Sequence, residues 1–205
     1  MMSDYLSEAI SMLLSKSLFL SVDFINDIVH PEGKISSCAA MVTQQNVIEK
    51  TNRALAWVRQ QGAQVAHVKV GFQPGYANCP EYSPVFGQAP QFRALELGSW
   101  GTAFHDALDV QSSELIIVKA RIGVFYNTSL ETLLRAKQIE HLILAGVSTN
   151  HAIEAAARDA HDRDYRVTVL SDCCAASSVE VHTQTLAGVM SHVAEVCTLD
   201  ELMRT

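Results

Sequence analysis

The chain has 205 residues, of which 48% are hydrophobic and 18% are charged, and its formal net charge is −7. This length and composition indicate one globular domain over residues 1–205 with enough apolar material for a core, and they exclude a largely disordered chain. No cluster of Lys or Arg interrupts the acidic balance, so we expect no nucleic-acid partner.

Residues 1–20 predict a short amphipathic helix that leads into a strand. Their apolar run is too short to span a membrane, and it follows acids where a signal peptide has bases, so we expect no membrane association. The cysteine spacing matches neither a metal-ligand nor a disulfide pattern, which favours reduced thiols in a cytoplasmic protein. The cysteines are Cys38, Cys79, Cys173, Cys174 and Cys197.

Short aliphatic runs alternate with longer amphipathic stretches along the rest of the chain. Strands that are apolar along their whole length are typical of parallel sheets covered on both faces. We therefore predict an α/β fold: a three-layer α/β/α, doubly wound, Rossmann-like domain with a six-stranded parallel sheet in the order 3-2-1-4-5-6. The predicted strands are 18–24, 63–70, 114–120, 141–147, 166–172 and 193–198, and the predicted helices lie near 42–61, 129–138, 149–163 and 178–191.

One segment, residues 71–99, does not follow this alternation. It holds four of the five prolines and four of the ten glycines. A segment of this length with little regular structure is usually a lid, a binding loop or an interface. We expect one of these functions for it.

Two charged residues stand where apolar strands are expected to end. Asp23 closes the first strand and Lys119 closes the third. In the predicted strand order both ends flank the crevice beside the first and fourth strands, where ligands bind in such sheets. An ion pair between them would hold the carboxylate ionised or share a proton with substrate. Alternatively, each charge only marks a strand that leaves the core.

The fourth strand ends in a turn, G-V-S-T-N-H-A at 146–152, that leads into a helical stretch. The start of a helix presents N–H groups to anions, so the main-chain N–H groups of His151 and Ala152 are candidates for stabilising negative charge. Ser148 or Thr149 could instead be a helix N-cap. The turn approaches the G-x-S-x-G pattern of a serine nucleophile, but Asn150 at the last position makes that match weak.

Four motifs occur in order along residues 18–203: V-D-x-x-N-D at 22–27, V-K-x-R-x-x-x-F at 118–125, G-V-S-T-N-x-x-x-E-x-x-A-R-D-A at 146–160 and S-D-x-x-A-A at 171–176. Together they resemble the isochorismatase-like (cysteine hydrolase) superfamily, which also includes nicotinamidases and other amidohydrolases. The resemblance implies a homo-oligomeric hydrolase with a small-molecule substrate and catalytic roles for Asp23 and Lys119. It also implies a non-proline cis peptide bond between Val147 and Ser148.

Two departures from that superfamily bear on the chemistry. Many members carry a nucleophilic cysteine early in the helix after the G-V-x-T turn. That position is Ala152 here, and a methyl group cannot attack a carbonyl. Nicotinamidases also carry an acid-x-His-x-x-His cluster after the second strand, whereas here His67 stands alone, so we expect no metal and no other cofactor.

The remaining site residues are assigned around the same crevice. Phe24 and Trp100 would supply an apolar wall, although core packing is an equal alternative for Phe24. Lys119-x-Arg121 is similar to the K-x-R of authentic isochorismatases, which also have a small residue in place of the cysteine and cleave an enol ether. His151 would either face substrate or lie on the helix surface. The substrate-binding candidates are Phe24, Trp100, Arg121, Ser148, Thr149 and His151.

The leading hypothesis is an isochorismatase-type hydrolase that acts on a small, carboxylated metabolite by Asp23 and Lys119 acid–base chemistry, without a cysteine nucleophile. Enol-ether hydrolysis of the isochorismate type is the named reaction. Two alternatives stay open: an amidohydrolase whose cysteine was replaced at Ala152, and a catalytically silent protein that binds a small molecule.

Overall fold

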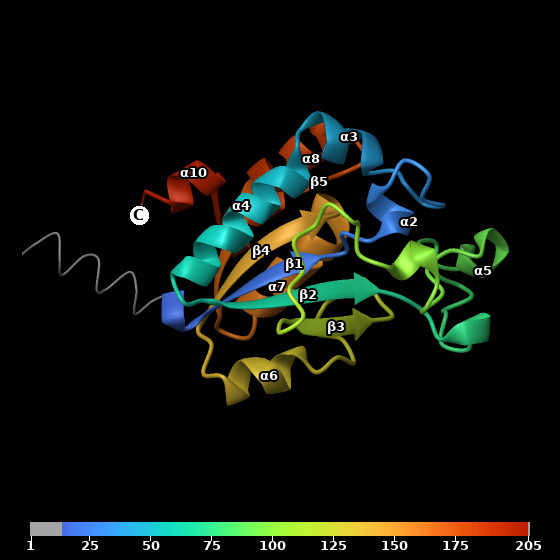
Figure 1. Ribbon diagram of the computed structural model, residues 1–205, viewed down its shortest axis with the longest axis horizontal. Coiled ribbons are helices and arrows are strands. Elements are labelled where there is room, and N and C mark those ends of the chain that lie inside the picture. Colours follow the sequence, from blue (N-terminus) through green and yellow to red (C-terminus); the bar gives the residue numbers. More distant parts are fainter. Residues whose placement is uncertain (1–13, 205) are drawn as a thin grey trace, which may run out of the picture.

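The computed structural model describes residues 14–204, which form a three-layer α/β/α domain (Figure 1). Its sheet has six parallel strands in the order β3-β2-β1-β4-β5-β6. This confirms the predicted fold class and strand order. The strands are β1 (Ser17–Val22), β2 (Gln64–Val70), β3 (Leu115–Lys119), β4 (His141–Val147), β5 (Arg166–Ala175) and β6 (Glu195–Cys197).

The burial of each strand follows from its place in the sheet. Every residue of β1 and β4 is buried, because these strands are central and both faces of the sheet are covered. The edge strand β3 differs, since its Leu115, Ile116 and Val118 are exposed. Two-sided burial therefore accounts for the continuous apolar runs only in the middle of the sheet.

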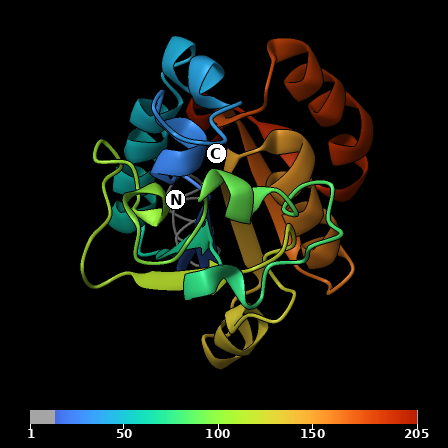
Figure 2. The same cartoon turned by 90° about the vertical axis from the view of Figure 1, so that its right-hand side faces the viewer.

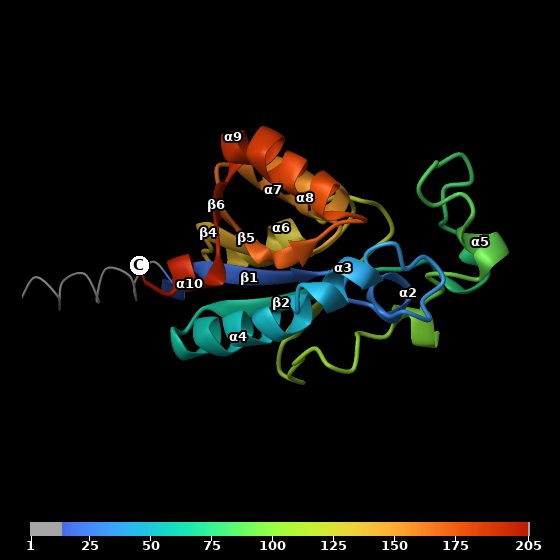
Figure 3. The same cartoon turned by 90° about the horizontal axis from the view of Figure 1, so that it is seen from above.

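Two groups of helices cover the two faces of the sheet (Figure 3). On one face Leu55 and Val58 join Phe19 in a hydrophobic cluster, and on the other Leu134 joins Leu18 in a second cluster. Within residues 14–204 no helix is long and apolar enough to cross a membrane. The first group is α3 (Ala39–Gln44), α4 (Val47–Gln60) and α10 (Leu199–Leu202), and the second is α6 (Leu130–Ala136), α7 (Glu154–His161), α8 (Val179–Thr185), η4 (Leu186–Met190) and α9 (Ser191–Val193).

The helices differ from the predicted ones mainly where they break. The stretch predicted as one helix at 42–61 forms α3 and α4, separated at Asn46, whose φ of 53° is left-handed. Asn adopts this conformation more readily than most residues, so the break falls there. The helix predicted at 149–163 begins as a π-helical turn, η3 (Thr149–Ile153). The helix expected before β1 lies mostly outside the described residues.

Residues 71–99, here called the 71–99 segment, fold over the carboxyl ends of the strands (Figures 1 and 2). Two short helices interrupt the segment, η1 (Pro74–Tyr76) and α5 (Ala89–Phe92). Its Phe72, Phe86 and Leu95 are buried in a third hydrophobic cluster with residues from the ends of the strands. The segment is thus packed on a small core of its own, which lets it wall a cavity.

Asp27, in α2 (Asn26–Val29), ties the 71–99 segment to the first strand. Its carboxylate is fully buried and accepts hydrogen bonds from the N–H groups of Leu95 (2.7 Å) and Lys34 (3.3 Å). Gly101, in η2 (Trp100–Thr102), passes so close that an added Cβ would lie 2.1 Å from Asp27 Oδ2. This close approach requires a glycine at position 101.

Candidate active site

A cavity of about 210 Å³ lies at the carboxyl ends of β1, β3 and β4, at the end of the molecule that Figure 2 faces. Its wall is mostly apolar, and the 71–99 segment contributes Val85, Phe86 and Leu95. An apolar pocket with a few convergent polar groups at this edge of a parallel sheet is typical of small-molecule sites. The polar lining residues are Asp23, Ser37, Cys38, Lys119, Ser148 and His151.

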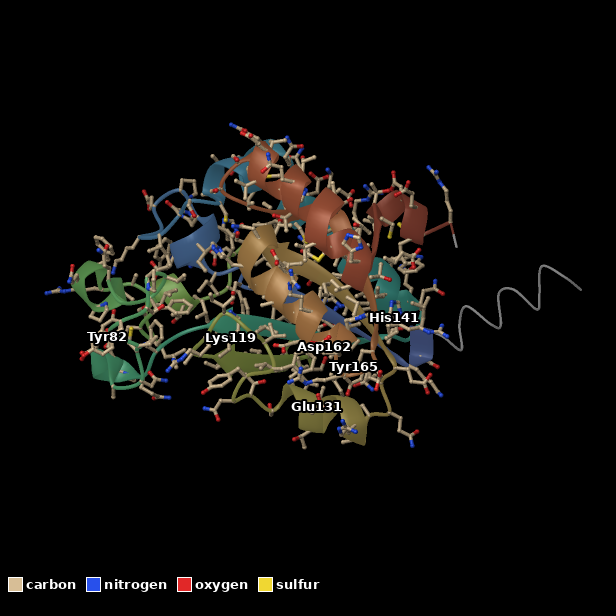
Figure 4. The ribbon with its side chains drawn as sticks, turned by 180° about the vertical axis from the view of Figure 1, so that it is seen from behind. Tyr82, Lys119, Glu131, His141, Asp162 and Tyr165 are labelled. Atoms are coloured by element: carbon tan, nitrogen blue, oxygen red, sulfur yellow. The ribbon has the colours of Figure 1, made fainter. Side chains whose placement is uncertain are left out.

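The structure brings Asp23 and Lys119 together at this cavity. Lys119 Nζ lies 2.7 Å from Asp23 Oδ2, and the two residues are only 2% and 3% exposed. Asp23 Oδ1 also accepts a hydrogen bond from the Val70 N–H (2.8 Å), and Lys119 donates to the Arg121 carbonyl (3.1 Å). Figure 4 shows Lys119 at the end of the sheet that faces the 71–99 segment, which carries Tyr82. The catalytic roles of the pair stay predictions.

Opposing influences act on the Asp23 carboxyl. Burial raises the pKa of Asp23 above its ordinary value of 3.8, while the charge and hydrogen bond of Lys119 and the Val70 N–H lower it. The net direction is upward, and burial is the largest of these influences. The Asp23 backbone is left-handed, with φ of 59°, and its N–H still bonds the Val68 carbonyl (2.8 Å). The chain thus turns sharply at Asp23 and presents the carboxyl to the cavity.

The turn after β4 forms the opposite side of the site. The peptide bond between Val147 and Ser148 is cis, as the resemblance implied. Gly146 is needed before it, because an added Cβ would lie 2.2 Å from the Val22 carbonyl oxygen. The His151 N–H donates to the Ser148 carbonyl (3.1 Å) in this structure, and the role expected for the N–H groups of His151 and Ala152 in stabilising negative charge stays a prediction.

Hydroxyl groups of the turn bond within the protein. The Ser148 hydroxyl donates to Asn150 Oδ1, and Thr149 Oγ1 lies 2.8 Å from Nδ1 of His182. Neither residue is a helix N-cap through its side chain, since Ser148 makes no capping bond and Thr149 contacts α8. Within residues 14–204 no histidine or carboxylate hydrogen-bonds Ser148, which leaves it without the base that a serine nucleophile needs.

The cavity has no thiol at position 152, but it has one at Cys38. Ala152 lines it with a methyl group, 4% exposed, and offers no nucleophile. Cys38, directly before α3, lines the same cavity and has no counterpart in the sequence-based prediction. Burial raises the pKa of the Cys38 thiol, and so does Asp23, while the hydroxyls of Ser37 and Ser148 lower it. The thiol is therefore held in its protonated form, a poor nucleophile.

The other predicted binding residues divide between cavity and core. Ser148 and His151 line the cavity, and His151 is also exposed to solvent. Phe24 is fully buried in the hydrophobic cluster beneath α4, which fits the core-packing alternative. Thr149 is likewise buried and turned away.

Trp100 and Arg121 do not line the cavity. Trp100 is 50% exposed and packs edge-on against His30, with ring centroids 5.0 Å apart. Arg121 donates to the Asn78 carbonyl (3.1 Å) and lines two neighbouring hollows. Both would have to move to touch a ligand bound beside Asp23.

Metal ligands do not gather around the site in the part of the chain that the structure describes. No group of three or more His, Cys, Asp or Glu side chains there could hold a metal ion. His67 is buried and pairs through Nε2 with Glu114 at 2.8 Å. A metal-independent reaction stays a prediction.

Comparisons with known proteins agree on the kind of molecule. A family model described as the isochorismatase domain matches residues 17–201. The chain is 29% identical to the isochorismatase family protein YecD from Escherichia coli O157:H7, over 84% of this chain and 89% of YecD. It is 30% identical to the ureidoacrylate amidohydrolase RutB from Yersinia enterocolitica, over 80% of this chain and 77% of RutB. The solved structure of a cysteine hydrolase from Pseudomonas syringae shares the fold, with a TM-score of 0.83, 24% identity and coverage of 93% of this chain and 92% of that one.

Proposed function

This chain belongs to the isochorismatase domain family, and from that premise we propose that it hydrolyses a small, carboxylated metabolite by acid–base chemistry, without a cysteine nucleophile. Asp23 is the general acid and Lys119 sets its protonation. The observation that carries the proposal is the buried Asp23–Lys119 pair, with its 2.7 Å contact, at a cavity where Ala152 supplies only a methyl group.

The pair suits the hydrolysis of an enol ether. Asp23, whose pKa burial raises, donates its proton to the terminal vinyl carbon, which leaves an oxocarbenium ion. A water molecule adds to that ion and returns a proton to the Asp23 carboxylate. The resulting hemiketal then collapses to a ketone and an alcohol. No covalent bond to the protein is needed, so the absence of a thiol at position 152 does not stop the reaction.

Charge and size restrict the substrate. When Asp23 is protonated, the Lys119 ammonium has lost its counter-ion and favours an anionic group of the substrate. Among the lining residues that the structure describes, Lys119 is the one ammonium or guanidinium group. A volume of about 210 Å³ is below the range of roughly 300–1,000 Å³ that drug-sized ligands occupy. We therefore favour a small monocarboxylate over a larger dicarboxylate.

Amide hydrolysis is the second candidate, because RutB is named as an amidohydrolase and Cys38 brings a thiol to the cavity from another element. For this reaction Cys38 would have to lose its proton, and Asp23, whose charge acts on the Cys38 thiol, is a candidate base among the lining groups. Because the pKa of the Cys38 thiol is raised, amide hydrolysis through Cys38 is the weaker of the two proposals.

Two substrate panels separate these reactions. One contains small vinyl-ether monocarboxylates, with isochorismate beside them as the larger dicarboxylate for comparison, and the other contains short amides and ureido acids, with products followed by NMR. We expect the native protein to hydrolyse vinyl ethers of the first panel. We expect the Ala152→Cys variant to gain hydrolysis of the amides in the second panel, and iodoacetamide to abolish that gained activity. Amide turnover by the native protein with a stoichiometric thioester on Cys38 would replace the proposal. Ligand-induced stabilisation without turnover of either panel would favour a silent binding protein.

A further inference from the structure

A contact between two buried polar side chains lies behind the turn that ends β4. Thr149 Oγ1 is 2.8 Å from Nδ1 of His182, a residue of α8. Thr149 is fully buried and His182 is 9% exposed. Among the residues that the structure describes, His182 is the one side chain that hydrogen-bonds this hydroxyl. A buried hydroxyl without a partner is costly, so the contact holds Thr149 against α8.

The turn between β4 and α7 has two sides. Ser148, His151 and Ala152 line the cavity, whereas Thr149 points away from it toward α8. Figure 3 shows α8 beside α7, on the same face of the sheet. The orientation of the turn toward the cavity therefore depends on the hydrogen bond between Thr149 and His182.

The surroundings of the His182 ring determine its protonation state. Burial lowers the pKa of His182, and a hydrogen bond to the Ser171 main chain opposes that shift. Since the net direction is below 6.5, the ring is neutral at pH 7 and keeps both a donor and an acceptor nitrogen. A neutral ring can make the 2.8 Å hydrogen bond with Thr149 as either donor or acceptor.

We propose that His182 is a positioning residue: through Thr149 it sets the place of Ser148 and Ala152 opposite Asp23 and Lys119. Its effect on the turn is independent of the reaction, and its effect on turnover rests on the proposed function. The test therefore begins with measurements that need no substrate.

The first measurement is amide hydrogen exchange with mass spectrometry. In His182→Leu and in Thr149→Val we expect peptides covering 148–153 to exchange roughly tenfold faster, as the loss of one buried hydrogen bond implies, while β1 and β2 stay unchanged. The double variant should exchange no faster than either single one, because both remove the same contact. His182→Asn, which keeps a polar atom near the Nδ1 position, should restore most of the protection. His192→Leu is the matched control on an exposed site of α9.

A second measurement places a reporter thiol in the turn. Ala152→Cys in a Cys38→Ser background gives one alkylation site at the cavity, and its rate with iodoacetamide reports the geometry of the turn. We expect His182→Leu to change that rate severalfold and His182→Asn to return it. With an identified substrate, His182→Leu should lower kcat more than it changes KM.

Three results would overturn the proposal. Exchange that rises equally across the whole sheet would give His182 only a structural role. Native-like exchange and alkylation in both His182→Leu and Thr149→Val would remove its influence on the turn. An equal effect of His192→Leu would show that the change is not specific. If His182→Leu does not fold, Thr149→Val and Thr149→Ser carry the same comparison.

Discussion

At the scale of single residues, the Asp23 carboxyl is pulled in opposite directions by its surroundings. Burial favours the neutral acid, and Lys119 at 2.7 Å favours the carboxylate. A group balanced in this way can donate a proton closer to neutral pH than an ordinary aspartate, and while it is protonated Lys119 can bind an anionic group. The pair is therefore where substitutions should have their largest effects.

Asp23→Asn keeps the shape of the side chain and removes its proton. Because a positioned general acid contributes roughly 10²–10⁴-fold, we expect kcat to fall by about that factor while KM changes little. Steady-state kinetics on the identified substrate measures this, with the exposed Asp162→Asn as the matched control (Figure 4). Near-normal kcat in Asp23→Asn would make Asp23 a structural acid.

Lys119→Met removes the cation whose charge and hydrogen bond lower the pKa of Asp23. The pKa of Asp23 should then rise further. Since the protonated acid is the active form, activity is lost as pH rises through this pKa, and the alkaline limb of the kcat/KM profile should move to higher pH. KM should also rise, because the ammonium that binds the anionic group is gone. The exposed Lys137→Met should leave the profile in place, and a limb that moved to lower pH would contradict the assignment.

Some residues of the site could be predicted from sequence and others could not, for a physical reason. Asp23 and Lys119 interrupt apolar runs at strand ends, and the geometry of a parallel sheet brings such ends together. Cys38 interrupts nothing: it follows two serines before a helix, and its entry into the cavity depends on how the chain folds back between α2 and α3. The same holds for Arg121, whose direction is set by the Asn78 carbonyl.

At the scale of elements, the sheet was predictable and the covering of the site was not. Hydrophobic runs in the sequence located all six strands. The runs are clearest in β1 and β4, because both faces of these strands are buried and every position is buried. The 71–99 segment has no such periodicity, and its course depends on a third cluster and on the hydrogen bond that Asp27 accepts from the Leu95 N–H. The sequence marked the segment as irregular and could not indicate which of its residues face the cavity.

Gly101→Ala tests the close packing between α2 and η2. The added Cβ would collide with the buried carboxylate of Asp27, so we expect the free energy of unfolding to fall by about 1–3 kcal/mol. For a chain of this size the Tm drops by roughly 2–4 °C per kcal/mol. Gly188→Ala in η4 is the matched control, since nothing lies within 4 Å of its added Cβ and Tm should stay constant or rise slightly. Calorimetry that gave the same result for both would contradict the close packing.

At the scale of the whole molecule, two central clusters on the faces of the sheet and a smaller one under the 71–99 segment hold the fold. None of the three clusters contains a metal ligand set in the part of the chain described here. Homo-oligomerisation and a cytoplasmic location, both expected from the sequence, stay predictions.

Metal removal should leave the whole molecule unchanged. After dialysis against a chelator we expect the Tm and the turnover of any identified substrate to stay the same, because apolar packing and the Asp23–Lys119 pair need no cation. Reproducible loss on chelation with recovery on adding Zn²⁺ or Mn²⁺ would overturn this prediction.

The position of β1 between β2 and β4 has a consequence for how the chain folds during synthesis. Val22 of β1 pairs with Val68 on one side and with Gly146 on the other. A ribosome adds about 5–20 residues per second, so β4 follows β1 after roughly 6–25 seconds. During that interval β1 and β2 can already pair, and the other edge of β1 stays open although its side chains are apolar. Such an edge is a template for pairing between nascent chains, which makes the yield of native protein depend on the speed of translation and on chaperones that cover β1.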